Sequence, residues 1–133
     1  MFSTKGRYAL RVMIDLAEHE SDGFIPLKDV AERQQISKKY LEIIVKELVG
    51  AGLISGVSGK GGGYKLTRPS GEYSVGEILE LMEGTLSPVA CLACEKNDCP
   101  KSSDCQTLPL WSEFDSMTRD FFYSRKLSSL IGK

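Results

Sequence analysis

The chain has 133 residues, of which 41% are hydrophobic and 26% charged, a composition that supports one packed core without disulfides. Charged residues break up the apolar positions of residues 1–20, which argues against a secretory signal or a membrane span and favours the cytoplasm. The net charge of −1 is unevenly divided, because residues 1–70 carry a net +3 and residues 71–133 a net −4, so the first half is better suited to contact phosphates.

Two amphipathic helices are predicted before residue 36. Apolar residues recur from Thr4 to about Glu20 at helical spacing, with Thr4 placed to cap the helix. Gly23 then breaks the pattern, and Pro26 suits the first turn of a second, short helix. The residues expected to be buried in this second helix are Leu27, Val30 and Ala31.

A third helix is predicted after Ser37, its expected N-cap, and it ends at Gly50 and Gly52. Two helices joined by a tight turn, the second opening with Ser-Lys-Lys, fit a helix-turn-helix, whose second helix enters a DNA major groove by its N-terminal residues. The positions of the third helix expected to be buried are Tyr40, Leu41, Ile44, Val45, Leu48 and Val49.

A β-hairpin is predicted next. Strand-like runs at 53–57 and 64–67 flank a basic, glycine-rich tip at 59–63. Three helices followed by a hairpin give the order of a winged helix-turn-helix domain, here over residues 1–70.

Residues 71–133 are predicted to form a connecting helix, a cysteine loop at 91–105 and a long C-terminal dimerisation helix. Ser74 and Glu77 are spaced as a capping box for the connecting helix. The expected fold is therefore mainly α with a small β-hairpin. The apolar residues that recur at helical spacing in the last helix are Leu110, Trp111, Phe114, Met117, Phe121 and Phe122.

Two groups of residues suit contact with double-stranded DNA. Ser37, Lys38, Lys39 and Tyr40 can donate hydrogen bonds to phosphates or base edges at a helix N-terminus. In the wing, the small side chains around Lys60 allow close approach of the backbone to DNA. The wing residues concerned are Lys60, Gly61 and Gly62. A plainer alternative makes the lysines a solvated helix face and Tyr40 part of the core.

Other classes of function fit less well. No Ser/His/Asp set, paired carboxylate cleft or nucleotide-binding loop occurs in the sequence, so an enzyme is not expected. An electron carrier would explain the cysteines but would leave the helix-turn-helix and the wing without a role.

All four cysteines fall within residues 91–105, in the pattern C-x2-C-x4-C-x5-C, and they are Cys91, Cys94, Cys99 and Cys105. Disulfides are disfavoured in a reducing compartment, so a metal is expected. Zinc usually takes two C-x2-C pairs, and only the first pair has that form, whereas iron–sulfur clusters tolerate irregular spacing. Zinc, an iron–sulfur cluster and metal-free redox-active thiols all remain open from the spacing alone.

The segments "STKGRYALRVMIDLA", "ISKKYLEIIVKELVGAGLISGVSGKGGGYKL" and "SVGEILELMEG", followed by the cysteines and "LW", resemble the winged-helix bacterial transcription regulators that include IscR, NsrR and CymR. The resemblance implies a cytoplasmic homodimer that reads a near-palindromic operator. It implies DNA contacts by Ser37, Lys39, Tyr40 and Glu42. The sequence departs from the family at Ser58, which stands where IscR has a wing arginine that inserts into the minor groove.

The same resemblance favours an iron–sulfur cluster, either 2Fe–2S or 4Fe–4S, over zinc. Three family cysteines match Cys91, Cys99 and Cys105, while Leu108 stands where IscR has its histidine ligand. Cys94 is the natural fourth ligand in this chain. The implied function is a transcription repressor that senses iron–sulfur, redox or nitric oxide status, and the alternative is the same regulator with structural zinc or reactive thiols.

Overall fold

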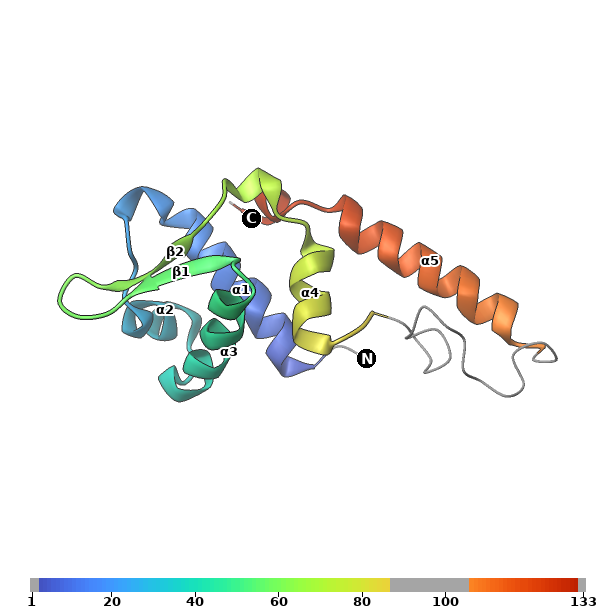
Figure 1. The fold of residues 1–133 in the computed structure, drawn as a ribbon, viewed down its shortest axis with the longest axis horizontal. Helices are drawn as coiled ribbons and strands as arrows, with labels where there is room; N and C mark the ends of the chain where they lie inside the picture. The colour runs from blue at the N-terminus through green and yellow to red at the C-terminus, as the bar shows by residue number, and fades with distance from the viewer. Residues whose placement is uncertain (1–2, 87–105, 132–133) are drawn as a thin grey trace.

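The computed structural model describes residues 3–86 and 106–131, and the fold is mainly helical with one antiparallel hairpin (Figure 1). The predicted winged helix-turn-helix fold with a long C-terminal helix is confirmed. In the described ranges, no helix combines the length and apolar character that crossing a membrane requires. In chain order the elements are α1 (Thr4–Glu18), η1 (Glu20–Asp22), α2 (Leu27–Gln34), α3 (Lys38–Gly50), β1 (Ile54–Val57), β2 (Gly63–Leu66), η2 (Ser70–Glu72), α4 (Val75–Glu83), α5 (Leu108–Ser124) and η4 (Leu127–Leu130).

Helix α1 begins one residue earlier than a Thr4 cap would allow. The N-cap is Ser3, whose hydroxyl accepts a hydrogen bond from the Gly6 N–H at 3.2 Å, and Thr4 is already helical. Glu83, at the end of α4, accepts hydrogen bonds from the Ser3 N–H at 2.9 Å and the Ser3 hydroxyl at 2.6 Å. The expected Thr4 cap is therefore wrong, because this contact with α4 favours Ser3.

One apolar core joins the winged helix to the C-terminal part of the chain. It is built around α1 and receives side chains from α2, α3, the hairpin, α4 and η4. Tyr73, between η2 and α4, and Leu127, in η4, are both completely buried in it. The orientation of α4 is thus fixed by the same core that holds the helix-turn-helix.

Helix α3 buries four of its six predicted core positions, namely Leu41, Ile44, Val45 and Leu48. Val49 is 40% exposed, so its predicted burial is wrong, and Tyr40 is only half-buried. At about 100° per residue, each of these two positions lies about 90° from the centre of the buried stripe. The contacts at each edge of the stripe, which the sequence pattern does not specify, decide how far such a position is covered.

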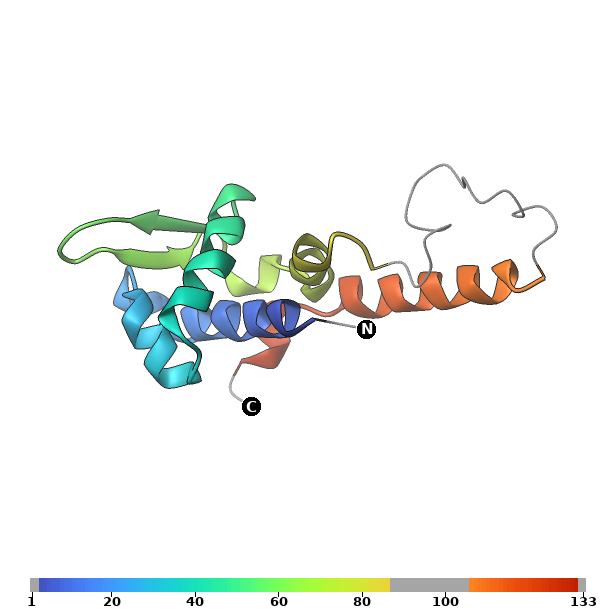
Figure 2. The ribbon, with the colours of Figure 1, turned by 90° about the horizontal axis from the view of Figure 1, so that it is seen from below.

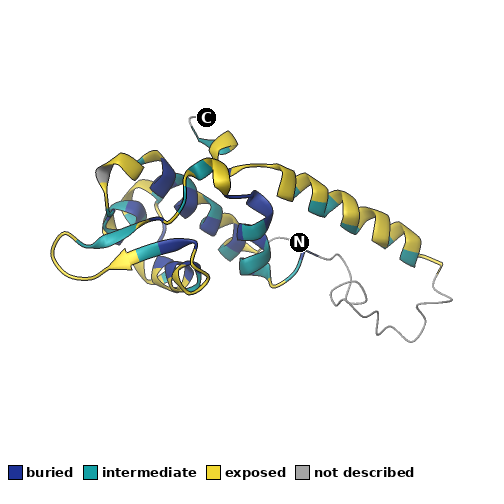
Figure 3. Cartoon of the chain, turned by 45° about the horizontal axis from the view of Figure 1, so that its top comes forward, coloured by how far each residue is buried: buried dark blue, intermediate teal, exposed yellow. Residues whose placement is uncertain are grey.

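The hairpin is anchored at its base and exposed at its tip. Ile54 pairs with Leu66 at the buried end, and Val57 pairs with Gly63 near the tip. Ile25, just before α2, adds a two-hydrogen-bond bridge to Tyr64. The wing is therefore tied to the α1–α2 connection, while its tip stands clear of the body (Figure 3).

Helix α5 leaves the body as a projecting arm, and only its C-terminal part lies near α4 (Figures 1 and 2). The apolar residues predicted at helical spacing end at Phe122, and α5 ends at Ser124, where the chain turns into an extended segment and then into η4. The Leu127 N–H donates to the Tyr73 carbonyl at 3.0 Å, and Ser74 forms a bridge with Lys126. Burial of Leu127 against a distant part of the chain ends the helix.

We expect Leu127→Ala to lower the free energy of unfolding by about 2–5 kcal/mol, because the change leaves a cavity in a fully buried site. Urea unfolding at one fixed protein concentration measures it. Ile43→Ala is the control, since that side chain is 55% exposed and should cost less than about 1 kcal/mol. Equal losses in the two variants would show that η4 adds little to the core.

Candidate nucleic-acid interface

The N-terminus of α3 is an exposed, basic helix end. Ser37 is its N-cap, as predicted, and its hydroxyl accepts from the Tyr40 N–H at 3.2 Å. Ser37, Lys38 and Lys39 are all exposed, and the first turn contains no acidic residue. The positive end of the helix dipole therefore lies beside two exposed lysines, which suits a phosphate.

Tyr40 lies at the rim of this helix end. Its ring is half-buried and packs edge-to-face on Tyr8 of α1, with 5.7 Å between ring centroids. The Arg11 guanidinium lies 5.4 Å from the centroid of the Tyr8 ring. Tyr40 thus packs partly against the core, as the plainer reading held, and still belongs to the exposed first turn of α3.

An ion pair between the buried Asp15 and the exposed Arg33, which sequence reasoning missed, links α2 to α1. Asp15 is 1% exposed and accepts two hydrogen bonds from Arg33, at 2.7 and 3.0 Å, and one from Gln34 at 2.9 Å. Arg11 donates to the Gln34 side chain at 3.1 Å. Because a buried charge needs partners, this network holds the turn before α3, where Gln35 has a φ of 55°. The available signal was an acidic residue within the apolar stripe of α1.

A groove of about 420 Å³ lies between α3 and the wing. It brings together Glu42 and Ser58, two of the positions that the family resemblance singled out, which lie in separate parts of the sequence. The residues that line it are Glu42, Lys46, Val49, Gly56, Val57, Ser58 and Tyr64. Lys46, which the plainer reading placed on a solvated helix face and which was not among the predicted DNA contacts, supplies a cation to this groove.

The wing tip holds the other predicted contacts, and Lys60 and Gly61 are exposed there. Gly61 has a φ of 78°, a conformation that favours glycine. A Cβ on Gly62 would lie 2.2 Å from the Val57 carbonyl oxygen, so the tight tip excludes any side chain there. These residues lie beyond the groove at the far end of the hairpin (Figure 1).

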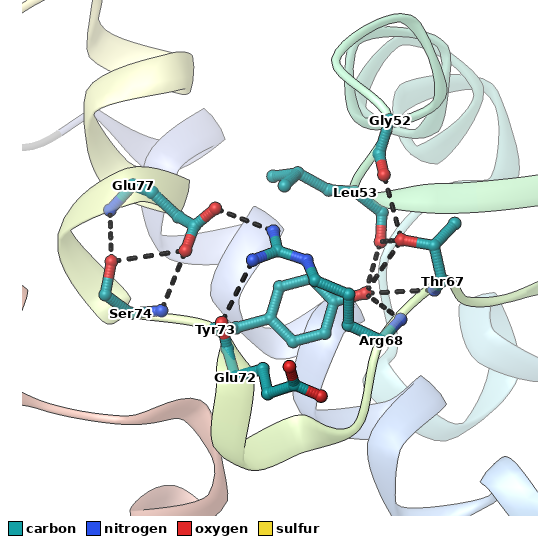
Figure 4. A network of polar contacts seen from close by, with 8 residues as sticks. All are labelled: Gly52, Leu53, Thr67, Arg68, Glu72, Tyr73, Ser74 and Glu77. Carbon is teal, nitrogen blue, oxygen red and sulfur yellow. Dashed lines mark hydrogen bonds and ion pairs between the residues drawn. The ribbon is translucent and has the colours of Figure 1, made fainter.

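The base of the wing is joined to α4 through the Tyr73 hydroxyl, shown in Figure 4. This hydroxyl accepts from the Thr67 N–H at 3.0 Å and the Arg68 N–H at 3.1 Å, and it donates to the Leu53 carbonyl at 2.6 Å. The Arg68 guanidinium stacks 4.2 Å from the centroid of the Tyr73 ring and reaches Glu77 of α4 at 2.8 Å. The base of the wing and the start of α4 are therefore joined by one polar cluster.

The predicted capping box of α4 is confirmed. The Ser74 hydroxyl accepts from the Glu77 N–H at 3.1 Å, and the Glu77 carboxylate accepts from the Ser74 N–H at 3.0 Å. Partial burial opposes ionisation of Glu77, but the hydrogen bonds from Arg68 and Ser74 and the Arg68 charge outweigh it, so the pKa of Glu77 is lowered.

The four predicted metal ligands, Cys91, Cys94, Cys99 and Cys105, lie outside the described residues. Their segment joins the end of α4 to the start of α5 in the sequence. Within residues 3–86 and 106–131, no group of three or more His, Cys, Asp or Glu side chains is arranged to hold a metal ion. The metal site formed by these cysteines thus remains a prediction from the sequence.

One exposed face of α5 is apolar. Leu110, Phe114, Met117 and Phe121 are 60, 38, 63 and 51% exposed, and they are spaced four, three and four residues apart. At its C-terminal end, α5 is held to α4, because the Tyr123 hydroxyl donates to Glu80. Burial and this hydrogen bond raise the pKa of Tyr123 to about 12, so the hydroxyl stays protonated.

A helix-turn-helix with an exposed third helix, a glycine-rich wing beside it and a projecting apolar helix define a winged-helix transcription regulator. The Rrf2 family model, described as iron-dependent transcriptional regulators, matches residues 2–133, and the chain belongs to this family. Its relatives are named as transcriptional regulators, so it is a regulator and not an enzyme. The resemblance seen in the sequence is thereby confirmed.

Individual relatives agree with this assignment. IscR of Photobacterium profundum is 36% identical over 129 residues, covering 97% of this chain and 74% of that protein. The structure of CymR, described as the global cysteine regulator of B. subtilis, has a TM-score of 0.79 at 32% identity, covering 98% of this chain and 95% of that chain. T. potens IscR has a TM-score of 0.74 at 32% identity, covering 98% and 85%.

We expect Glu77→Gln to lower stability at pH 7 by about 1 kcal/mol, because it removes the ionic partner of Arg68 and weakens the cap. A carboxyl with a lowered pKa stabilises the fold above its ordinary value of 4.5 and loses this effect as the pH falls through the lowered pKa. The deficit should therefore shrink in acid. Urea unfolding at several pH values measures it, with Glu32→Gln as an exposed control. A deficit independent of pH would contradict the ionic role of Glu77.

Proposed function

We propose that this protein is a homodimeric repressor that binds operator DNA, with its affinity set by an iron–sulfur cluster on Cys91, Cys94, Cys99 and Cys105. The observation that carries the DNA part is the exposed N-terminus of α3 beside the groove to the wing. The proposed DNA contacts are Ser37, Lys38, Lys39, Tyr40, Glu42, Lys60, Gly61 and Gly62. Each contact between a lysine and a phosphate releases counterions, so binding should weaken steeply as the salt concentration rises.

The dimer is supported by the spacing of the exposed apolar residues on α5. Steps of four, three and four residues keep side chains on one face of paired helices, as in a coiled coil. An exposed stripe of this kind on a projecting helix favours a second copy of the same chain as its occupant. Two winged helices related by two-fold symmetry would then meet the two halves of a near-palindromic operator.

The cluster is supported by the chemistry of the donor set. Four thiols within fifteen positions can supply every ligand of a 2Fe–2S or 4Fe–4S cluster from one chain. The description of the family as iron-dependent agrees with this choice. When bound, the cluster would supply iron–thiolate bonds that oxidants and nitric oxide attack. The C-x2-C spacing of Cys91 and Cys94 favours structural zinc as the second candidate.

Helix α4 is the proposed route from the cysteine segment to the DNA-binding surface. Its C-terminal end leads into that segment, and its N-terminal end is bonded to the wing through Glu77 and Arg68. Its side holds α5 through Glu80, which bonds to Tyr123 and Arg119. Ligation of the four thiols would bias the position of α4 and, with it, both the wing and the dimer arm.

We expect anaerobically purified protein to be brown, to contain iron and sulfide, and to bind an operator selected from random DNA. The visible spectrum, metal and sulfide analysis and a binding titration provide the measurements. A variant with all four cysteines changed to serine should be colourless and differ at least fivefold in operator affinity. Colourless wild-type protein with one zinc per chain would replace the cluster by zinc, and equal affinities in every redox state would contradict the switch.

We expect Met117→Glu to dissociate the dimer, since it places charges on the apolar stripe of both copies. Sedimentation equilibrium should show mainly monomer at micromolar concentration, with weaker operator binding. Ser112→Glu is the matched control, because residue 112 is exposed about 180° around the helix from the stripe. A dimer that tolerates Met117→Glu would place the contact elsewhere.

A further inference from the structure

Ile43 is the exposed aliphatic residue on the outer ridge of α3. Its side chain is 55% exposed, while Leu41, Ile44 and Val45 beside it in the sequence are buried. At about 100° per residue, Ile43 lies about 30° from the direction opposite to the buried stripe of α3. It therefore faces almost directly outward from the domain.

Two lysines share this outer ridge with Ile43. Lys39 is four residues before it and Lys46 three residues after it, so all three side chains lie on one face of the helix, and both lysines are exposed. They are about 6 Å and 4.5 Å from Ile43 along the helix axis. Long lysine chains can reach phosphates at the rims of a DNA groove, whereas a short isoleucine reaches only what lies directly beneath it.

Single exposed aliphatic residues are common on protein surfaces and usually need no explanation. Ile43 differs because it stands at the outermost point of the helix that the proposed function places in the major groove. It is also absent from the residues that line the groove to the wing, which Glu42, Lys46 and Val49 face from the same helix. The side chain thus has neither a core nor the wing to cover it.

The chemistry of the major groove limits what Ile43 can contact favourably. Its side chain neither donates nor accepts a hydrogen bond, and the apolar group that base pairs present in the major groove is the 5-methyl group of thymine. A cytosine amino group or a guanine carbonyl beneath it would lose water without gaining a partner. We propose that Ile43 is a specificity-determining residue that reads the thymine 5-methyl group at one position in each operator half-site.

This proposal rests on the proposed operator binding, and the test separates the two. In an operator selected from random DNA, each thymine of a half-site is replaced by deoxyuridine, together with its symmetry mate, which removes only the methyl group. We expect one position to weaken binding of the wild-type protein by about fourfold per half-site. The Ile43→Ala variant should bind the thymine and uracil forms of that position equally.

Val49→Ala is the matched control, because Val49 is also exposed on α3 but faces the wing. This variant should keep the full sensitivity to uracil. If wild-type protein binds tightly but no uracil effect depends on Ile43, the thymine proposal is overturned and the proposed function stands. If Ile43→Ala weakens all sites by the same factor, the residue does not read a base. If no selected DNA binds at all, both proposals fail.

Discussion

The complete burial of Tyr73 is the constraint on which the arrangement of this protein depends. Its ring lies in the core built around α1. Its hydroxyl bonds to the backbone at the base of the wing, just before β1 at Leu53 and just after β2 at Thr67. A buried phenol needs such partners, so the wing base and the start of α4 cannot move independently without leaving polar groups unsatisfied. The salt bridge from Arg68 to Glu77 strengthens the same junction. The orientation of the wing is therefore coupled to the orientation of α4.

Helix α3 meets two opposing demands. Its apolar stripe must face the core to hold the helix-turn-helix together, while its first turn must stay open for a ligand. The Ser37 cap serves both, because its side-chain oxygen begins the helix by accepting from the Tyr40 N–H, while Lys38 and Lys39 stay exposed. The ion pair between the buried Asp15 and Arg33 then holds the preceding turn. Interior contacts thus set the position of α3, and its exposed first turn is left available to contact a ligand.

Local signals predicted local structure well. The Ser37 cap, the Ser74 and Glu77 capping box and the glycine-rich hairpin each depend on residues a few positions apart, and the structure confirms all three. The errors arise where distant contacts decide. Ser3 rather than Thr4 caps α1 because Glu83 of α4 lies beside it. Asp15 in the apolar stripe of α1 signalled a buried charge, but the sequence did not identify its partners, because they lie 18 and 19 residues away.

The exposed apolar residues of α5 and of α3 suggest different roles. On α5 four of them repeat at coiled-coil spacing along an arm that leaves the body, a pattern that supports the proposed pairing with another helix. On α3 a lone isoleucine stands between lysines, which suits a mostly polar surface with one apolar feature, as DNA presents. Helix α4 is bonded both to the base of the wing, through Glu77, and to α5, through Glu80. In the proposed function, a change in the segment after α4 would thus act on the DNA-binding surface and on the proposed dimer helix together.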